Sequence, residues 1–144
     1  MKIVITGGLG HIGSALIREA VLVQRCEEVS IIDDMSTQRF ASLFNLPSGV
    51  IYSLYQGDVE EQLTIALVEG ADAVVHLAGI TEPLVSVSDP NWLFENNLRI
   101  TQHVADTCAL VGTPLVFVSS TSVYTSSDAV VDETCTDLSP TSPY

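Results

Sequence analysis

The fold of this chain is decided by residues 2–13, which read KIVIT (2–6) followed directly by GGLGHIG (7–13). The first part is a short run dominated by β-branched apolar residues, which is typical of a buried strand. Beyond it, apolar residues recur at helical intervals, at Ile12, Leu16, Ala20 and Val23. This spacing predicts a helix, so the glycines lie in a turn between a strand and a helix.

The glycines of this turn have the spacing of a dinucleotide-binding motif. Gly8, Gly10 and Gly13 fit the pattern G-x-G-x-x-G, and Gly7 in place of Gly8 gives a G-x-x-G-x-x-G variant. Without a Cβ, such residues permit a tight turn and let the backbone approach a pyrophosphate closely. The free amides at the start of the following helix then favour an anion.

A second strand is expected over residues 29–32 (VSII), ending at Asp33 and Asp34. Asp33 follows Gly13 by 20 residues, the interval at which a carboxylate accepts hydrogen bonds from the adenosine ribose. The same carboxylate repels a 2′-phosphate, which favours NAD over NADP. A solvated turn after a strand is the alternative interpretation of this acidic pair. Arg39 is the nearest base that weakens the preference for NAD.

Strands and helices alternate along the rest of the chain. Further strands are expected at residues 50–55, 73–77 and 115–118, and further helices at residues 60–69 and 92–110. Such alternation predicts an α/β fold with a doubly wound, Rossmann-like parallel sheet. Right-handed crossovers then give the strand order 3-2-1-4-5.

The long helix carries a polar residue within its apolar stripe. The stripe consists of Leu93, Asn97, Ile100, Val104, Cys108 and Val111. A buried amide costs free energy unless it is hydrogen-bonded, so Asn97 is expected to tie the helix to a strand end or loop. Asn96 points about 100° away from it and is a candidate for facing the strand ends where a cofactor binds.

The composition limits the classes of function. A length of 144 residues suits one compact domain. The net charge of −13, from 5 basic and 18 acidic residues, argues against a nucleic-acid partner. No apolar run approaches the ~20 residues of a membrane span. The three cysteines and three histidines lack the spacing of metal ligands, so no metal is expected, and reduced thiols in a cytoplasmic protein account for the cysteines.

Short motifs follow one another through the whole chain in a fixed order. They are TGGLGHIG (6–13), DD (33–34), GDV (57–59), HLAG (76–79), SVSDP (86–90), NLRIT (97–101), VSSTSVY (118–124), DET (132–134) and SPY (142–144). Each motif is weak alone, but the ordered set resembles the N-terminal part of the NAD-dependent epimerase/dehydratase family. This family belongs to the extended short-chain dehydrogenases/reductases and includes UDP-galactose 4-epimerase.

The resemblance implies NAD as the cofactor and a nucleotide sugar as the substrate. The residues implied at the pyrophosphate are Gly7, Gly10, His11, Ile12 and Gly13. Those implied at the adenosine are Asp33 and Asp34 for the ribose and Asp58 and Val59 beside the adenine, while Leu77, Ala78 and Gly79 line the channel toward the nicotinamide. Two alternatives stay open: Asp58 is a helix cap, and His76 is a hydrogen-bonded histidine at a strand end.

For chemistry, the resemblance implies Ser120 and Tyr144 as the catalytic residues, with Thr121 as the alternative to Ser120. The tyrosine of this family exchanges a proton with a substrate hydroxyl while NAD exchanges hydride, and a lysine four positions later lowers the tyrosine pKa. The chain has no lysine after Lys2. Residues 1–144 are therefore expected to be an incomplete NAD-binding domain, without its last strands and substrate domain, and to be inactive alone.

A second class of function stays open beside the enzyme. A Rossmann-like fold does not by itself specify catalysis, so a non-catalytic dinucleotide-binding or regulatory module is the alternative. A homodimer is compatible with the resemblance in either case.

Overall fold

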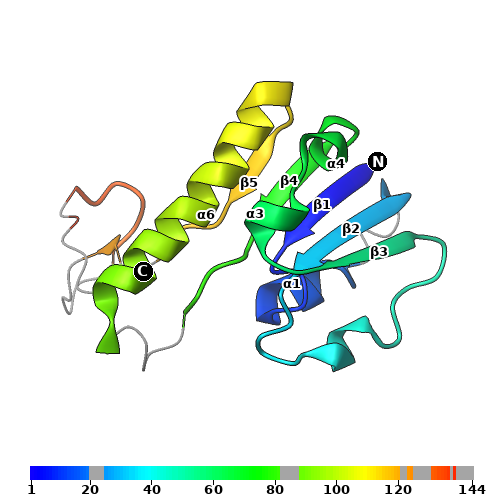
Figure 1. Cartoon of the computed structure of the whole chain (residues 1–144), viewed down its shortest axis with the longest axis horizontal. Helices are drawn as coiled ribbons and strands as arrows, with labels where there is room; N and C mark the ends of the chain where they lie inside the picture. Colours follow the sequence, from blue (N-terminus) through cyan, green and yellow to red (C-terminus); the bar gives the residue numbers. More distant parts are fainter. Residues whose placement is uncertain (20–24, 82–87, 121–122, 125–130, 137, 139–144) are drawn as a thin grey trace. The chain divides into compact units, whose positions relative to one another are not determined.

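The computed structural model describes residues 1–19, 25–81, 88–120, 123–124, 131–136 and 138 (Figure 1). The chain forms two compact units. The first comprises Met1–Gly79 and Ile100–Val118, and the second comprises Ile80–Arg99 and Ser119–Tyr144.

The first unit is built on a five-stranded parallel sheet (Figure 1). Its strands are β1 (Lys2–Thr6), β2 (Glu28–Asp33), β3 (Ile51–Gln56), β4 (Ala73–His76) and β5 (Leu115–Phe117). Their order is β3-β2-β1-β4-β5, which confirms the predicted topology. In the centre of the sheet, Ile5 pairs with Ile31 on one side and with Val75 on the other.

Alternating residues of β1 enter two separate hydrophobic cores. Ile3 and Ile5 join Leu9 and Ile17 in the core beneath α1 (His11–Leu16) and η1 (Phe40–Leu43). Leu43 of η1 packs against this core. Val4 joins the core on the other side of the sheet, with residues from α3 (Val59–Gln62), α4 (Ile65–Glu69) and α6 (Pro90–Val111). This two-residue period gives the sheet a layer of helices on each face.

The helix predicted over residues 60–69 is two short helices, α3 and α4, so that prediction was wrong in its continuity. Asp58 begins the first by accepting a hydrogen bond from the Glu60 amide (2.8 Å). Thr64 has extended backbone angles and begins the second by accepting from the Leu67 amide (3.3 Å). Short polar side chains compete with helical hydrogen bonding in this way, so Thr64 interrupts the helix.

The first helix buries only part of the apolar face that its spacing defines, since Leu16 is half-buried against the core. Ile12 is 60% exposed, whereas Gly13 and Ile17 are buried. A Cβ on Gly13 would lie 2.6 Å from the carbonyl oxygen of Gly8, so the side of α1 without a side chain rests directly on the turn. This close approach orients the helix more strongly than the burial of Ile12 would. Ala20 and Val23 lie outside the described residues.

The long helix α6 confirms its predicted stripe. Leu93, Ile100, Val104 and Cys108 are all buried, with exposures of 5% or less. Asn97 makes a pair of hydrogen bonds with Ile80, in which its Nδ2 donates to the carbonyl (2.9 Å) and its Oδ1 accepts from the amide (2.9 Å). The polar residue in the stripe is therefore bonded to the loop after β4, as expected.

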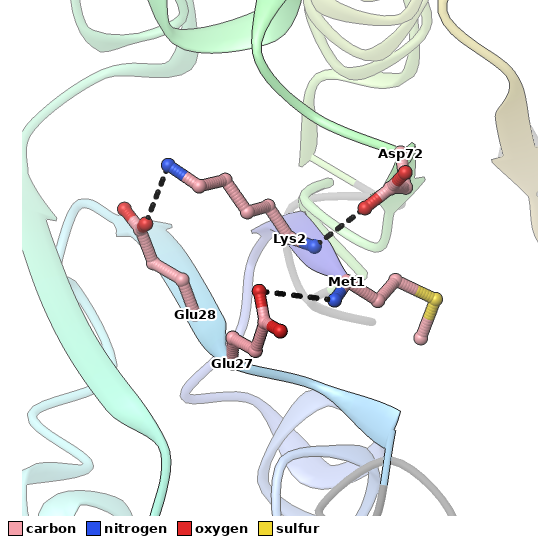
Figure 2. A network of polar contacts seen from close by, with 5 residues as sticks. All are labelled: Met1, Lys2, Glu27, Glu28 and Asp72. Atoms are coloured by element: carbon pink, nitrogen blue, oxygen red, sulfur yellow. Dashed lines mark hydrogen bonds and ion pairs between the residues drawn. The ribbon is translucent and has the colours of Figure 1, made fainter.

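Charged groups gather at the amino ends of the central strands (Figure 2). The Nζ of Lys2 lies 2.8 Å from a carboxylate oxygen of Glu28, its register partner, and this hydrogen bond raises the pKa of Lys2. The Lys2 amide donates to Asp72 (2.7 Å), and the terminal ammonium of Met1 lies 3.5 Å from Glu27. Lys2 is thus paired at the end of the sheet opposite the glycine turn.

Candidate functional site

The carboxyl ends of four strands are joined by hydrogen bonds at one edge of the sheet. The Gly7 amide, just after β1, donates to the carbonyl of Ile32 in β2 (2.7 Å). The Leu77 amide, after β4, donates to the Thr6 carbonyl (3.0 Å), and the Gly57 amide, after β3, donates to the Asp33 carbonyl (3.1 Å). The strand order reverses at β1, and an α/β sheet binds its ligands at such a point, outside the carboxyl ends of its strands.

The glycine turn is packed so closely that two of its positions exclude a side chain. Gly7 has a φ of +65°, and a Cβ there would lie 2.7 Å from the Ala78 amide nitrogen. Gly13 would place a Cβ 2.6 Å from the Gly8 carbonyl oxygen. The turn therefore needs glycine both for its backbone conformation and for its contact with the segment after β4.

Asp33 holds this turn against the end of β2. Its side chain is only 8% exposed; Oδ2 accepts from the Leu9 amide (2.9 Å) and Oδ1 from the Met35 amide (3.0 Å). Asp34 is exposed, and its Oδ1 accepts from the Ser36 amide (2.9 Å). The two acidic residues thus have different surroundings, and the solvated turn considered from the sequence describes Asp34 and not Asp33.

A buried histidine lies beneath the same edge. His76 is 2% exposed, with its Nδ1 2.6 Å from the Thr6 hydroxyl and its Nε2 3.1 Å from the Thr101 hydroxyl. Its ring also stacks on Phe117, with ring centroids 6.0 Å apart. Burial lowers the pKa of His76 to about 4, so the imidazole is neutral at neutral pH. This confirms the interpretation of His76 as a hydrogen-bonded histidine at a strand end.

The Thr6 hydroxyl determines which nitrogen of His76 carries the proton. Its oxygen accepts from the Ala78 amide (3.2 Å), and it shares the Leu77 amide (3.3 Å) with the Thr6 carbonyl, which lies closer (3.0 Å). The single hydroxyl hydrogen of Thr6 is then donated to Nδ1 of His76. In the tautomer that matches this assignment, Nε2 carries the imidazole proton and donates it to the Thr101 hydroxyl. Sequence reasoning missed Thr6 and Thr101, because threonines in a strand and a helix give no signal of a shared partner.

The remaining predicted cofactor residues differ in exposure. His11 is exposed, and its ring faces the Arg39 guanidinium, with Nε2 2.8 Å from Nη2 and Nδ1 3.2 Å from Nη1. Asp58 is the N-cap of α3, as the alternative interpretation proposed, and Val59 is buried in the core. Leu77 and Ala78 are half-buried and Gly79 is exposed.

The predicted catalytic residues belong to the second unit. The Ser120 carbonyl accepts a hydrogen bond from the Val123 amide (3.3 Å), and the side chain is half-buried. Tyr144 and Thr121 lie outside the described residues, so the structure does not place the catalytic pair together. In the same unit, Oδ1 of Asn96 accepts from Nη2 of Arg99 (3.1 Å).

Among the helices that the structure describes, none is long and apolar enough to cross a membrane. Over the same part of the chain, no group of three or more His, Cys, Asp or Glu side chains is arranged to hold a metal ion.

Known proteins are similar to this chain in sequence and in fold. Residues 3–144 match the NAD dependent epimerase/dehydratase family. A UDP-glucose 4-epimerase of Klebsiella pneumoniae is 32% identical over 130 residues, covering 86% of this chain and 92% of that sequence. A UDP-glucose 4-epimerase of Corynebacterium glutamicum is 32% identical over 146 aligned positions, covering 100% of this chain and 42% of the relative.

A solved structure agrees with these relatives. A dTDP-glucose 4,6-dehydratase from Streptomyces venezuelae with NAD bound superposes with a TM-score of 0.80 at 26% identity, covering 100% of this chain and 47% of that protein. The chain thus spans less than half the length of this dehydratase and of the Corynebacterium relative. Since the family match extends over nearly every residue, this chain belongs to the NAD-dependent epimerase/dehydratase family.

Proposed function

We propose that this chain is the NAD-binding part of a nucleotide-sugar epimerase or dehydratase that works by transient hydride transfer. The observation that carries the proposal is the tightly packed glycine turn, held by the buried Asp33 at the carboxyl edge of the sheet. Membership of an NAD-dependent family supports it, as do the relatives that are named for UDP-glucose and dTDP-glucose.

The residues of the first unit suit NAD. The amides of His11, Ile12 and Gly13 occupy the first three positions of α1, where a helix supplies no carbonyl to accept them. They would hold the pyrophosphate, beside a turn in which Gly10 is half-buried and carries no side chain. Each carboxylate oxygen of Asp33 accepts one amide and keeps a further lone pair for a ribose hydroxyl. Its negative charge would also repel the 2′-phosphate of NADP.

The chemistry is divided between cofactor and protein. NAD, when bound, supplies the acceptor and donor of hydride. Tyr144 takes a proton from a substrate hydroxyl and later returns it, while the Ser120 hydroxyl orients the same oxygen. Leu77 and Ala78, fixed by the Thr6 hydroxyl, form part of the wall toward the nicotinamide.

Two features of the sequence narrow the reaction. Thr121 and Ser122 stand where a dehydratase of this family carries an acidic pair, so epimerase or simple dehydrogenase chemistry is favoured over dehydration. The net charge of −13 argues against a nucleic acid as the partner, and membership of the family supports a nucleotide sugar as the substrate. We further propose a cytoplasmic homodimer as the working form.

The full-length protein tests this proposal in two steps. NAD and NADP are first titrated by calorimetry, and we expect NAD to bind at least about tenfold more tightly, since one charge repulsion of this kind is worth ~1.4 kcal/mol or more. UDP-glucose is then supplied, and formation of its 4-epimer is followed by chromatography. Tyr144→Phe should abolish product formation and leave NAD affinity nearly unchanged.

Three outcomes separate the candidate functions. Binding of NAD with turnover supports the enzyme. Binding of NAD without turnover of UDP-glucose or dTDP-glucose supports the non-catalytic module. Failure to bind either dinucleotide overturns both.

A further inference from the structure

Arg18, just beyond the end of α1, donates to backbone carbonyls on two sides. Its Nη1 bonds to the Ser14 carbonyl in α1 (2.6 Å), and its Nη2 bonds to the Ser42 carbonyl (2.7 Å) and the Phe44 carbonyl (3.1 Å). A weaker contact reaches the Ala41 carbonyl at 3.5 Å. The chain has only five lysines and arginines, and one of them, Arg18, joins η1 to α1. Sequence reasoning missed it, because a lone arginine on a helix has the appearance of a solvated residue.

Ser42 carries this connection into the glycine turn. Its hydroxyl donates to the Leu9 carbonyl (2.9 Å), while the Leu9 amide donates to Asp33 (2.9 Å). Leu9 lies between Gly8 and Gly10 and is fully buried. Both polar groups of its backbone are therefore held, the amide by the end of β2 and the carbonyl by η1.

A third contact joins the same loop to the start of α1. The Arg39 guanidinium faces the ring of His11, the first residue of the helix, at 2.8 Å and 3.2 Å. Residues 39–44 thus touch the turn or its helix at His11 and Leu9, and Arg18 holds their far end.

We propose that residues 39–44, which we call the clasp, set the conformation of the pyrophosphate-binding turn, and that Arg18 and Ser42 are its positioning residues. Neither side chain belongs to the sheet or to the two hydrophobic cores. Among the described residues, the Arg18 guanidinium is the one donor to the Ser42 and Phe44 carbonyls outside regular secondary structure, and the Ser42 hydroxyl is the one such donor to the Leu9 carbonyl. The link to NAD rests on the proposed function, but the link to the conformation of the turn does not.

The experiment compares variants of the full-length protein that remove one donor each. Arg18→Met keeps most of the aliphatic stem and removes the guanidinium. Ser42→Ala removes the hydroxyl, and Ser42→Thr restores it. Arg25→Met and Ser48→Ala are matched controls at exposed positions outside the clasp.

Hydrogen exchange without nucleotide measures the turn itself. Arg18→Met and Ser42→Ala should accelerate exchange of the Leu9 and Gly10 amides, which donate described hydrogen bonds to Asp33 and Gly7, about tenfold, the effect of losing one or two hydrogen bonds. Ser42→Thr and both controls should stay within twofold of the parent protein. Unchanged exchange in Arg18→Met and Ser42→Ala overturns the clasp, whether or not the protein binds NAD.

Affinities for NAD and ADP, measured by calorimetry, test the consequence for the cofactor. Both should weaken about tenfold and in parallel in Arg18→Met and Ser42→Ala, because both ligands carry the pyrophosphate. Ser42→Thr should bind like the parent. A loss of affinity without faster exchange of the Leu9 and Gly10 amides overturns the clasp as its cause. If Arg18→Met does not fold, Arg18→Lys takes its place, with a smaller effect expected in the same direction because Lys lacks the planar fork.

Discussion

Nδ1 of His76 accepts the hydroxyl hydrogen of Thr6 across 2.6 Å, and both residues are buried at the carboxyl ends of neighbouring strands. The same hydroxyl oxygen receives the amides of Leu77 and Ala78. One hydroxyl group thus joins β1 to β4 and to the segment that leads toward the proposed nicotinamide position. Its effect depends on His76 being neutral, since a protonated imidazole has no acceptor to offer.

Acidification should therefore destabilise the protein through His76. Its pKa is lowered from 6.5 to about 4 in the folded chain. The unfolded chain binds the proton more readily between these values, so the stabilisation is present above pH 6.5 and is lost as pH falls toward 4. It amounts to at most about 3 kcal/mol. Denaturant unfolding at pH 7 and pH 4.5 measures it, and His76→Gln should show a smaller drop than the parent. An equal drop in both proteins would assign the acid sensitivity to other groups.

Thr6→Val should destabilise the folded chain while conserving the volume of the side chain. The variant leaves the Ala78 amide and the Nδ1 of His76 without the hydroxyl, whereas the Leu77 amide keeps its bond to the carbonyl of residue 6, and a buried group left unpaired costs ~1 to 3 kcal/mol. Thr6→Ser keeps the hydroxyl and should lose less. Urea unfolding of the three proteins at neutral pH provides the comparison, and equal stability of the Val and Ser variants would contradict it.

Gly13→Ala should destabilise the folded chain, whereas Gly70→Ala should not. Alanine is the better helix former, but a Cβ on Gly13 would meet Gly8 at 2.6 Å, so strain should outweigh propensity and cost ~1 to 3 kcal/mol. At Gly70 no atom lies within 4 Å of the added Cβ, and φ is −92°. Alanine there should be neutral or stabilising by up to ~1 kcal/mol. Thermal melting checks both, and a stabilised Gly13→Ala would show that α1 can move off the turn.

Asp33→Asn should affect both the turn and the choice of cofactor. The Asn side chain keeps one oxygen, which can accept from the backbone amide of Leu9 or of Met35. Its NH₂ group then faces the other backbone amide, donor against donor, so a loss of ~1 to 3 kcal/mol in stability is expected. Without the negative charge, the proposed discrimination against NADP should fall. Parallel titration of NAD and NADP against parent and variant measures this. An unchanged ratio of the two affinities would remove Asp33 from the recognition of the ribose.

The sequence by itself determined the sheet order, the positions of all five strands and the place of the glycine turn. These follow from local causes: β-branched runs form strands, and glycine permits a backbone that other residues resist at Gly7, with its φ of +65°. The stripe of α6 and the hydrogen-bonded Asn97 could be predicted for the same reason, since a helix repeats every 3.6 residues.

Only the tertiary structure decided which groups meet across long separations in the chain. Thr6 and His76 are 70 residues apart, and Leu9 and Ser42 are 33 apart. The position of a hydroxyl or a guanidinium in the sequence does not indicate which distant residue it will bond to. The buried side of α1 was likewise set by the contact of Gly13 with Gly8, where close packing outweighed the apolar spacing of Ile12. Periodicity reports which residues can be buried, whereas their hydrogen-bond partners depend on how the strands and loops are brought together.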